Sequence, residues 1–95
     1  MRTYKVTPLL DKKLRKIVKK DKDLHEILFK KIFEVTTVED IHHYKNLKHP
    51  LEKLKRVHVK SSFVLLFTEK ENHILFVDYD HHDKIYKSGN YQAWL

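Results

Sequence analysis

The spacing of apolar residues changes once along the chain, and this change constrains the fold more than any other feature. From residue 8 to residue 37, apolar residues recur at the three- and four-residue spacing of amphipathic helices. From Leu54 onward they alternate with polar residues or form short continuous runs, which is typical of strands. A helical part followed by a strand part predicts an α+β fold.

The helical part contains two amphipathic helices. Thr7 is placed to cap the first helix and Pro8 suits its first position. A polar joint at residues 21–23 separates the second helix, and Asp23 followed by Glu26 indicates a capping box there. We expect the two helices to form an antiparallel hairpin with one broad apolar side. Its apolar residues are Leu10, Leu14, Ile17 and Val18, then Leu24, Ile27, Leu28, Phe29, Ile32, Phe33 and Val35.

The strand part predicts a three-stranded antiparallel meander. Val57 and Val59 alternate with polar residues, residues 63–68 form a continuous apolar run, and residues 74–77 form another. A short β-prone segment at residues 4–6 supplies a further strand at the N-terminus. We therefore expect one twisted antiparallel sheet with the helices on one face, in a single domain that spans residues 1–95.

Composition limits the class of protein. The chain has 20 lysines and arginines against 13 acidic residues, a net charge of +7, which favours nucleic acid or an acidic protein as partner. It has no cysteine, so disulfides and thiol nucleophiles are excluded. The longest apolar run, residues 63–67, is too short to cross a bilayer, and the N-terminus lacks the features of a signal peptide. We expect a cytoplasmic protein with no membrane partner.

One predicted strand face concentrates charge and titratable groups. Arg56, His58 and Lys60 alternate on the same face, at roughly 6.6 Å steps along the strand, so they can contact successive phosphates. Histidine also suits proton transfer, because its unperturbed pKa lies near neutrality. If the helices cover the other face, this face is open to ligand.

The histidines invite a metal interpretation, which the sequence disfavours. His42-His43 and His81-His82 are the obvious pairs, but adjacent residues on a strand point to opposite faces. The sequence also lacks a His-Glu-x-x-His helix motif, and Gly89 is the only glycine, which excludes a glycine-rich phosphate loop. We therefore predict no metal site and no cofactor.

Three motifs, in this order and spacing, resemble the RelE/ParE superfamily of bacterial and archaeal type II toxins. They are His49-Pro50-Leu51 before the meander, the strand–turn–strand segment at residues 58–67, and His82 followed four residues later by Tyr86. Within the superfamily the chain is most similar to the YafQ-type and RelE-type mRNA interferases. The resemblance covers nearly the whole chain and implies the RelE-like microbial ribonuclease fold.

The resemblance also implies an activity. Such toxins are metal-independent endoribonucleases that cleave mRNA in the ribosomal A site, by attack of the RNA 2′-hydroxyl on the adjacent phosphate. The expected partners are mRNA on the ribosome and a cognate antitoxin with an acidic amphipathic segment. The family's catalytic residues fall on His49, His58, His82 and Tyr86, with His82 and His49 sharing the acid and base roles. Phosphate-binding positions are Lys48, Arg56, Lys60 and Ser62, and Ser62 stands where the family has an aspartate.

Two alternatives remain open from the sequence. A ParE-like toxin would share the fold and poison DNA gyrase, but its action does not need the three motif histidines. A catalytically degenerate, RNA-binding member is favoured by Ser62, which cannot act as a carboxylate. Cleavage of ribosome-bound mRNA separates the enzyme from both alternatives.

Overall fold

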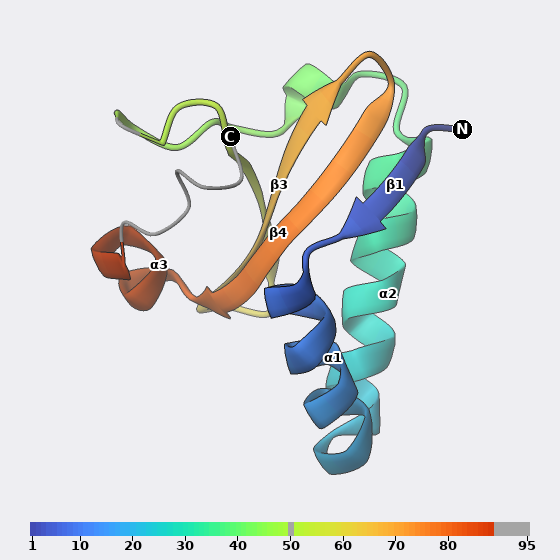
Figure 1. Cartoon of the computed structure of the whole chain (residues 1–95), viewed down its shortest axis with the longest axis vertical. Coiled ribbons are helices and arrows are strands. Elements are labelled where there is room, and N and C mark those ends of the chain that lie inside the picture. Colours follow the sequence, from blue (N-terminus) through green and yellow to red (C-terminus); the bar gives the residue numbers. More distant parts are fainter. Residues whose placement is uncertain (50, 89–95) are drawn as a thin grey trace.

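The computed structural model describes residues 1–49 and 51–88, with residues 86–88 described by their backbone only. Figure 1 shows a single sheet with two long helices on one side. In chain order the elements are β1 (Thr3–Val6), α1 (Pro8–Lys20), α2 (Lys22–Thr37), the 3-10 turn η1 (Ile41–His43), β2 (Lys55–Val59), β3 (Phe63–Lys70), β4 (His73–His81) and α3 (His82–Ser88).

The strand order is β1-β4-β3-β2, and the predicted meander of β2, β3 and β4 is confirmed as antiparallel. β1, however, lies parallel to β4, with Tyr4 opposite Ile74, so the sheet is mixed and the prediction of a wholly antiparallel sheet is wrong. The direction of β1 follows from the helix after it. The backbone N–H of Thr7 donates to Phe76 O at 3.0 Å and its hydroxyl donates to Val77 O, so α1 must start beside the edge of β4.

The helix caps explain where the hairpin turns. Thr7 caps α1 as predicted, because its side-chain oxygen accepts from the Leu10 N–H at 3.1 Å. The cap of α2 is Asp21, which accepts from the Leu24 N–H at 3.0 Å, so the predicted capping role of Asp23 is wrong. Asp21 also ends α1, and α2 follows immediately from Lys22. Asp23 therefore lies inside the first turn, where its charge suits the helix dipole.

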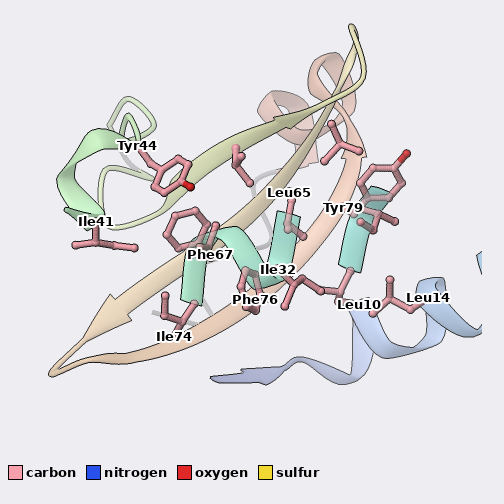
Figure 2. Packing of buried hydrophobic residues seen from close by; sticks show 14 residues of the cluster. Leu10, Leu14, Ile32, Ile41, Tyr44, Leu65, Phe67, Ile74, Phe76 and Tyr79 are labelled. Carbon is pink, nitrogen blue, oxygen red and sulfur yellow. The ribbon is translucent and has the colours of Figure 1, made fainter. Parts of the chain in front are cut away.

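The main core lies between the helical hairpin and one face of the sheet (Figure 2). Phe67 and Phe76 are fully buried there, with ring centroids 5.9 Å apart. Phe29 and Phe33 were expected to widen the apolar side of α2, but they are 42% and 60% exposed and lie outside the core. The buried apolar residues that α1 and α2 supply are Leu10, Leu14, Leu28, Ile32 and Val35.

The second face of the sheet is covered too, so the expectation of an open face is wrong for most of its area. Ile85 of α3 and leucines from the loop before β2 pack on this face, on the side of the sheet away from α1 and α2 (Figure 1). α3 is an element that the sequence analysis did not predict. The second core contains Leu47, Leu51, Leu54, Val64, Leu66, Val77 and Ile85.

Side chains on β4 change faces at a bulge. Leu66 pairs with Asp78 while the next residue, Phe67, pairs with Phe76, so Val77 is an extra residue on β4. Because directly opposed residues share a face, Asp78 lies on the second face with Leu66.

Within the described residues, no helix is long and apolar enough to span a membrane.

Candidate functional site

The end of β2, the start of β3 and the end of β4 meet at one end of the sheet. Val59 pairs with Phe63, and Phe63 pairs with His81. We call residues 58–63 and 80–83 together the histidine end. It lies opposite the turn that joins β3 to β4 (Figure 1). Of the predicted site residues, it contains His58, Lys60, Ser62 and His82.

The turn in the histidine end redirects one predicted phosphate-binding residue. Lys60 has a φ of 57°, in the left-handed region, and β2 ends one residue earlier at Val59. The prediction that Lys60 continues the strand face of Arg56 and His58 is therefore wrong. Its exposed side chain belongs to the turn, while His58 is exposed on β2, the edge strand of the sheet.

His82 is held by two acceptor oxygens. Its backbone N–H donates to Ser62 O at 3.0 Å, and its ring Nδ1 lies 3.3 Å from the same oxygen. Its other ring nitrogen, Nε2, lies 3.1 Å from Asp83 Oδ1. A carbonyl and a carboxylate can only accept, so a proton on either ring nitrogen of His82 has an acceptor beside it. Asp83 thus supplies a carboxylate to the site, and Ser62 takes part through its backbone oxygen.

His81 and Asp83 are parts of this cluster that the predicted site omitted. The His81 ring stacks on the His82 ring with centroids 4.9 Å apart, and it makes a T-shaped contact with the Phe63 ring at 5.5 Å. The reasoning that adjacent histidines must point to opposite faces fails here. β4 ends at His81 and α3 begins at His82, so strand alternation does not apply across the pair.

Two other carboxylates near the site are neutralised by Lys13. Its Nζ lies 2.7 Å from Asp78 Oδ1 and 3.1 Å from Asp80 Oδ2, and it donates to Tyr79 O at 3.0 Å. Burial alone would lower the pKa of Lys13, but the hydrogen bonds and charges of the two aspartates outweigh burial and raise it. For Asp80, burial favours a higher pKa, yet the His81 N–H and Lys13 together lower it. Asp78 and Asp80 therefore stabilise the end of β4.

A basic groove runs along the outer edge of β2. It consists of two adjoining hollows of about 490 and 570 Å³, which share Lys45 and Arg56. His58 borders the first hollow and Lys48 borders the second, so Arg56 connects these two predicted residues. We call this surface the β2 groove. Its cationic lining, with Lys45, Lys48 and Arg56, suits a polyanionic chain.

Two predicted residues are not brought to His82 by the described contacts. The exposed His49 has its Nδ1 3.2 Å from Glu52 Oε1, within its own loop before β2. Its predicted convergence with His58 and His82 stays a prediction. Tyr86 lies in α3, but its side chain falls outside the described residues. The family resemblance assigned these two residues to the site, and a sequence motif alone does not give side-chain positions.

Two relatives cover most of the chain, and one of them has a family name. No family model matches the sequence. A protein of Methanocaldococcus jannaschii named "Putative toxin RelE4" is 51% identical over 89 residues, which cover 92% of this chain and 93% of that protein. An uncharacterized protein of Methanosarcina mazei is 46% identical over 84 residues, or 86% of this chain and 95% of that protein.

Solved structures give the same fold. The YoeB dimer of Staphylococcus aureus matches with a TM-score of 0.70 at 17% identity, covering 85% of this chain and 97% of that one. YafQ of Escherichia coli matches with a TM-score of 0.64 at 13% identity, covering 90% and 99%. A metal-bound toxin of Helicobacter pylori matches with a TM-score of 0.71 at 28% identity, covering 90% and 99%. With its M. jannaschii relative and this shared fold, the chain belongs to the RelE/ParE superfamily of toxins.

Proposed function

We propose that residues 1–95 form one toxin domain of a type II toxin–antitoxin system, acting in the cytoplasm as a metal-independent endoribonuclease on mRNA in the ribosomal A site. One observation carries the proposal. In a chain of this superfamily, His82 lies between the Ser62 carbonyl and the Asp83 carboxylate at a sheet end that also exposes His58 and Lys60. This end offers proton donors and cations together, which RNA cleavage needs.

The proposed reaction is an internal transesterification. The 2′-oxygen bonds to the adjacent phosphorus, and the bond from phosphorus to the 5′-oxygen breaks. A base takes the proton of the 2′-hydroxyl, and an acid gives a proton to the departing 5′-oxygen, leaving a 2′,3′-cyclic phosphate and a 5′-hydroxyl. We assign the acid to His82, because the Ser62 carbonyl and the Asp83 carboxylate beside its ring nitrogens can orient a proton-bearing nitrogen toward the leaving oxygen.

The base is a second histidine of the site, His58 or His49. His58 lies at the same sheet end as His82, whereas His49 enters from the loop next to Lys48. The RNA backbone follows the β2 groove, where Arg56 and Lys48 neutralise phosphates. Lys60 and the Ser62 backbone border the scissile phosphate, and Tyr86 orients the neighbouring nucleotide. Alanine substitutions of His58 and His49, measured side by side, identify the base by the larger loss of rate.

The antitoxin is the second proposed partner. A hollow of about 600 Å³ between α1 and the end of β4 has Ile17, Leu24 and Tyr79 in its lining, with Lys16 and Lys20 beside them. An acidic amphipathic segment fits this mixture of apolar and cationic groups. Among the structural neighbours, YoeB of S. aureus is found in complex with YefM, which supports a partner of this kind. Charge reversal at Lys16 and Lys20 should weaken antitoxin binding more than reversal at Lys12 and Lys19.

The test is primer extension on mRNA from cells that express the chain, with wild type beside His82→Ala and His73→Ala. Cuts phased with codons in wild type and His73→Ala, and absent from His82→Ala, support the proposal. Growth arrest without cuts would point instead to a gyrase-type target. Neither arrest nor cuts would indicate a degenerate member of the family.

A further inference from the structure

Three potential metal ligands gather where β4 passes into α3. His81, His82 and Asp83 each offer one ligand atom, and these atoms lie within 4.8 Å of one another. His82 Nε2 is 3.1 Å from Asp83 Oδ1, and His81 Nδ1 is 3.7 Å from Asp83 Oδ2. Their side chains are 36%, 47% and 64% exposed, so an ion can reach all three from solvent.

The two separations that involve Asp83 are close to what one ion requires. Two donor atoms bound at 2.0–2.2 Å to a tetrahedral Zn²⁺ are about 3.3 Å apart. The His82–Asp83 pair is already close to this separation. His81 Nδ1 also accepts from the Asp83 backbone N–H at 3.3 Å, so an ion on this nitrogen replaces that hydrogen bond while the exposed Asp83 side chain adjusts. Two imidazoles and a carboxylate would fill three positions and leave the fourth to water.

The hydrogen bonds of His82 strengthen the case. A metal-binding histidine usually donates its second ring N–H to a carbonyl or carboxylate, which fixes the ring and its tautomer. His82 Nδ1 lies 3.3 Å from Ser62 O in this way. When Nδ1 carries the proton, the lone pair of Nε2 faces an oxygen of Asp83, and only a second proton or a cation between them makes this approach favourable. The edge of Phe63 holds the His81 ring beside them.

We infer that His81, His82 and Asp83 bind a divalent transition-metal ion, and that the bound ion inhibits the nuclease. The inhibitory part rests on the proposed function, because it requires His82 to be the acid. An ion on Nε2 takes the electron pair that would carry the transferable proton, so a metal-bound His82 cannot protonate the 5′-oxygen. The ion is therefore a regulator of the site.

The ligand set also selects the ion. Imidazole nitrogens suit Zn²⁺, Ni²⁺ and Cu²⁺, whereas Mg²⁺ prefers oxygen ligands and retains its waters. The exposed position of all three side chains favours exchange with the surrounding ion pool. Zn²⁺ is the probe of choice, with Mg²⁺ as the negative control and Co²⁺ as a coloured substitute that reports coordination geometry.

The first experiment is calorimetric titration of the purified, metal-free chain with ZnCl₂. We expect one saturable site in wild type, unchanged by excess Mg²⁺. His81→Ala and Asp83→Asn should each lower the affinity at least about tenfold, in line with the cost of disturbing metal ligands. His42→Ala removes an exposed histidine from the other histidine pair and should leave the affinity unchanged. Equal affinities in all four proteins, or no saturable binding in wild type, would overturn the inference.

A second readout keeps the result independent of subtle folding changes. Co²⁺ bound to wild type should give visible absorption bands of a four- or five-coordinate site, and these bands should disappear in His81→Ala. Circular dichroism should show the same thermal unfolding for metal-free wild type and variant. Co²⁺ bands of equal intensity in both proteins would place the ion elsewhere and overturn the assignment.

The inhibition is tested by ribosome-dependent cleavage with and without Zn²⁺, each protein being compared with its own metal-free rate. Zn²⁺ should slow wild type and leave His81→Ala unaffected at the same concentration. Zinc binding without any change in the wild-type rate would overturn the inhibitory role and preserve the binding site. A wild type that binds Zn²⁺ but never cleaves mRNA would instead overturn the proposed function.

Discussion

The two ends of the sheet use similar backbone geometry for different purposes. At the hairpin end, Glu71 and Asn72 both have positive φ, at 52° and 64°, and join β3 to β4 as a tight two-residue turn. At the histidine end, Lys60 has a φ of 57° in the turn between β2 and β3. Each end also places a histidine on or beside β4: His73 at the first and His82 at the second.

The partners of these two histidines differ in kind. His73 Nδ1 lies 2.7 Å from the hydroxyl oxygen of Thr3, which can either donate to the ring nitrogen or accept from it. His82 faces a carbonyl and a carboxylate, which only accept. The comparison teaches that the chemistry open to a histidine depends on the atoms around it more than on its place along a strand. His73→Ala is therefore the matched control for His82→Ala.

The largest expected effect separates the two histidines by activity. His82→Ala should reduce ribosome-dependent cleavage by about 10²- to 10⁴-fold, the usual worth of a general acid or base. His73→Ala should leave cleavage within a few-fold of wild type, because its Thr3 contact lies at the hairpin end. Single-turnover cleavage rates measure both. Equal losses in the two variants would end the functional distinction between the sheet ends.

The next effect concerns stability at the histidine end. Lys13→Met removes the cation that lies 2.7 Å from the carboxylate of Asp78, whose side chain is only 4% exposed. We expect a loss of about 2–3 kcal/mol in the free energy of unfolding, below the value for a fully buried pair because Lys13 is partly exposed. Urea unfolding measures the change, and Lys12→Met on the exposed face of α1 is the control. A loss no larger than that of the control would show that the ion pairs contribute little.

A smaller effect is expected at the hairpin end. Replacing Glu71 and Asn72 together by Asn and Gly gives the pair that best tolerates two consecutive left-handed residues. The double variant should gain about 1 kcal/mol in stability through relief of backbone strain. Thermal and urea unfolding test the gain, and cleavage activity should not change. Reduced activity would indicate that the two sheet ends are coupled.

The smallest effect involves Tyr79, whose buried hydroxyl has no hydrogen-bond partner within the described part of the chain. Tyr79→Phe should therefore change stability at neutral pH by no more than about 0.5 kcal/mol, and in the favourable direction. Burial, followed by the charges of Asp80 and Asp21, raises the pKa of Tyr79 to about 12.

The raised pKa gives this variant a pH signature. Because the folded pKa exceeds the unfolded value of about 10, wild-type stability is fully present below pH 10 and falls as pH rises toward 12. Tyr79→Phe should lose less stability over that interval. Urea unfolding at a series of alkaline pH values tests this, and parallel losses in wild type and variant would contradict the assigned pKa.

Local sequence determined most of the elements. Thr7 and Pro8 located the start of α1, and alternation around Val57 located β2 within a residue or two. These predictions succeed because caps, proline and side-chain period act within a few residues. The cap of α2 was missed because Asp21 and Asp23 are equally good caps in the sequence. α3 was missed because its seven residues give too short a pattern, and only Ile85 packing on the second face reveals it.

By itself, then, the sequence determined the helix–helix–meander order, the surplus of positive charge and the candidate histidines. The tertiary structure alone decided which side chains meet. The parallel direction of β1 depends on where α1 docks, and the bulge at Val77 sets the register in which Asp78 and Asp80 both contact Lys13 of α1. The stacking of His81 on His82 likewise depends on the strand ending between them. Each of these contacts joins residues through packing, which a local pattern in the sequence cannot specify.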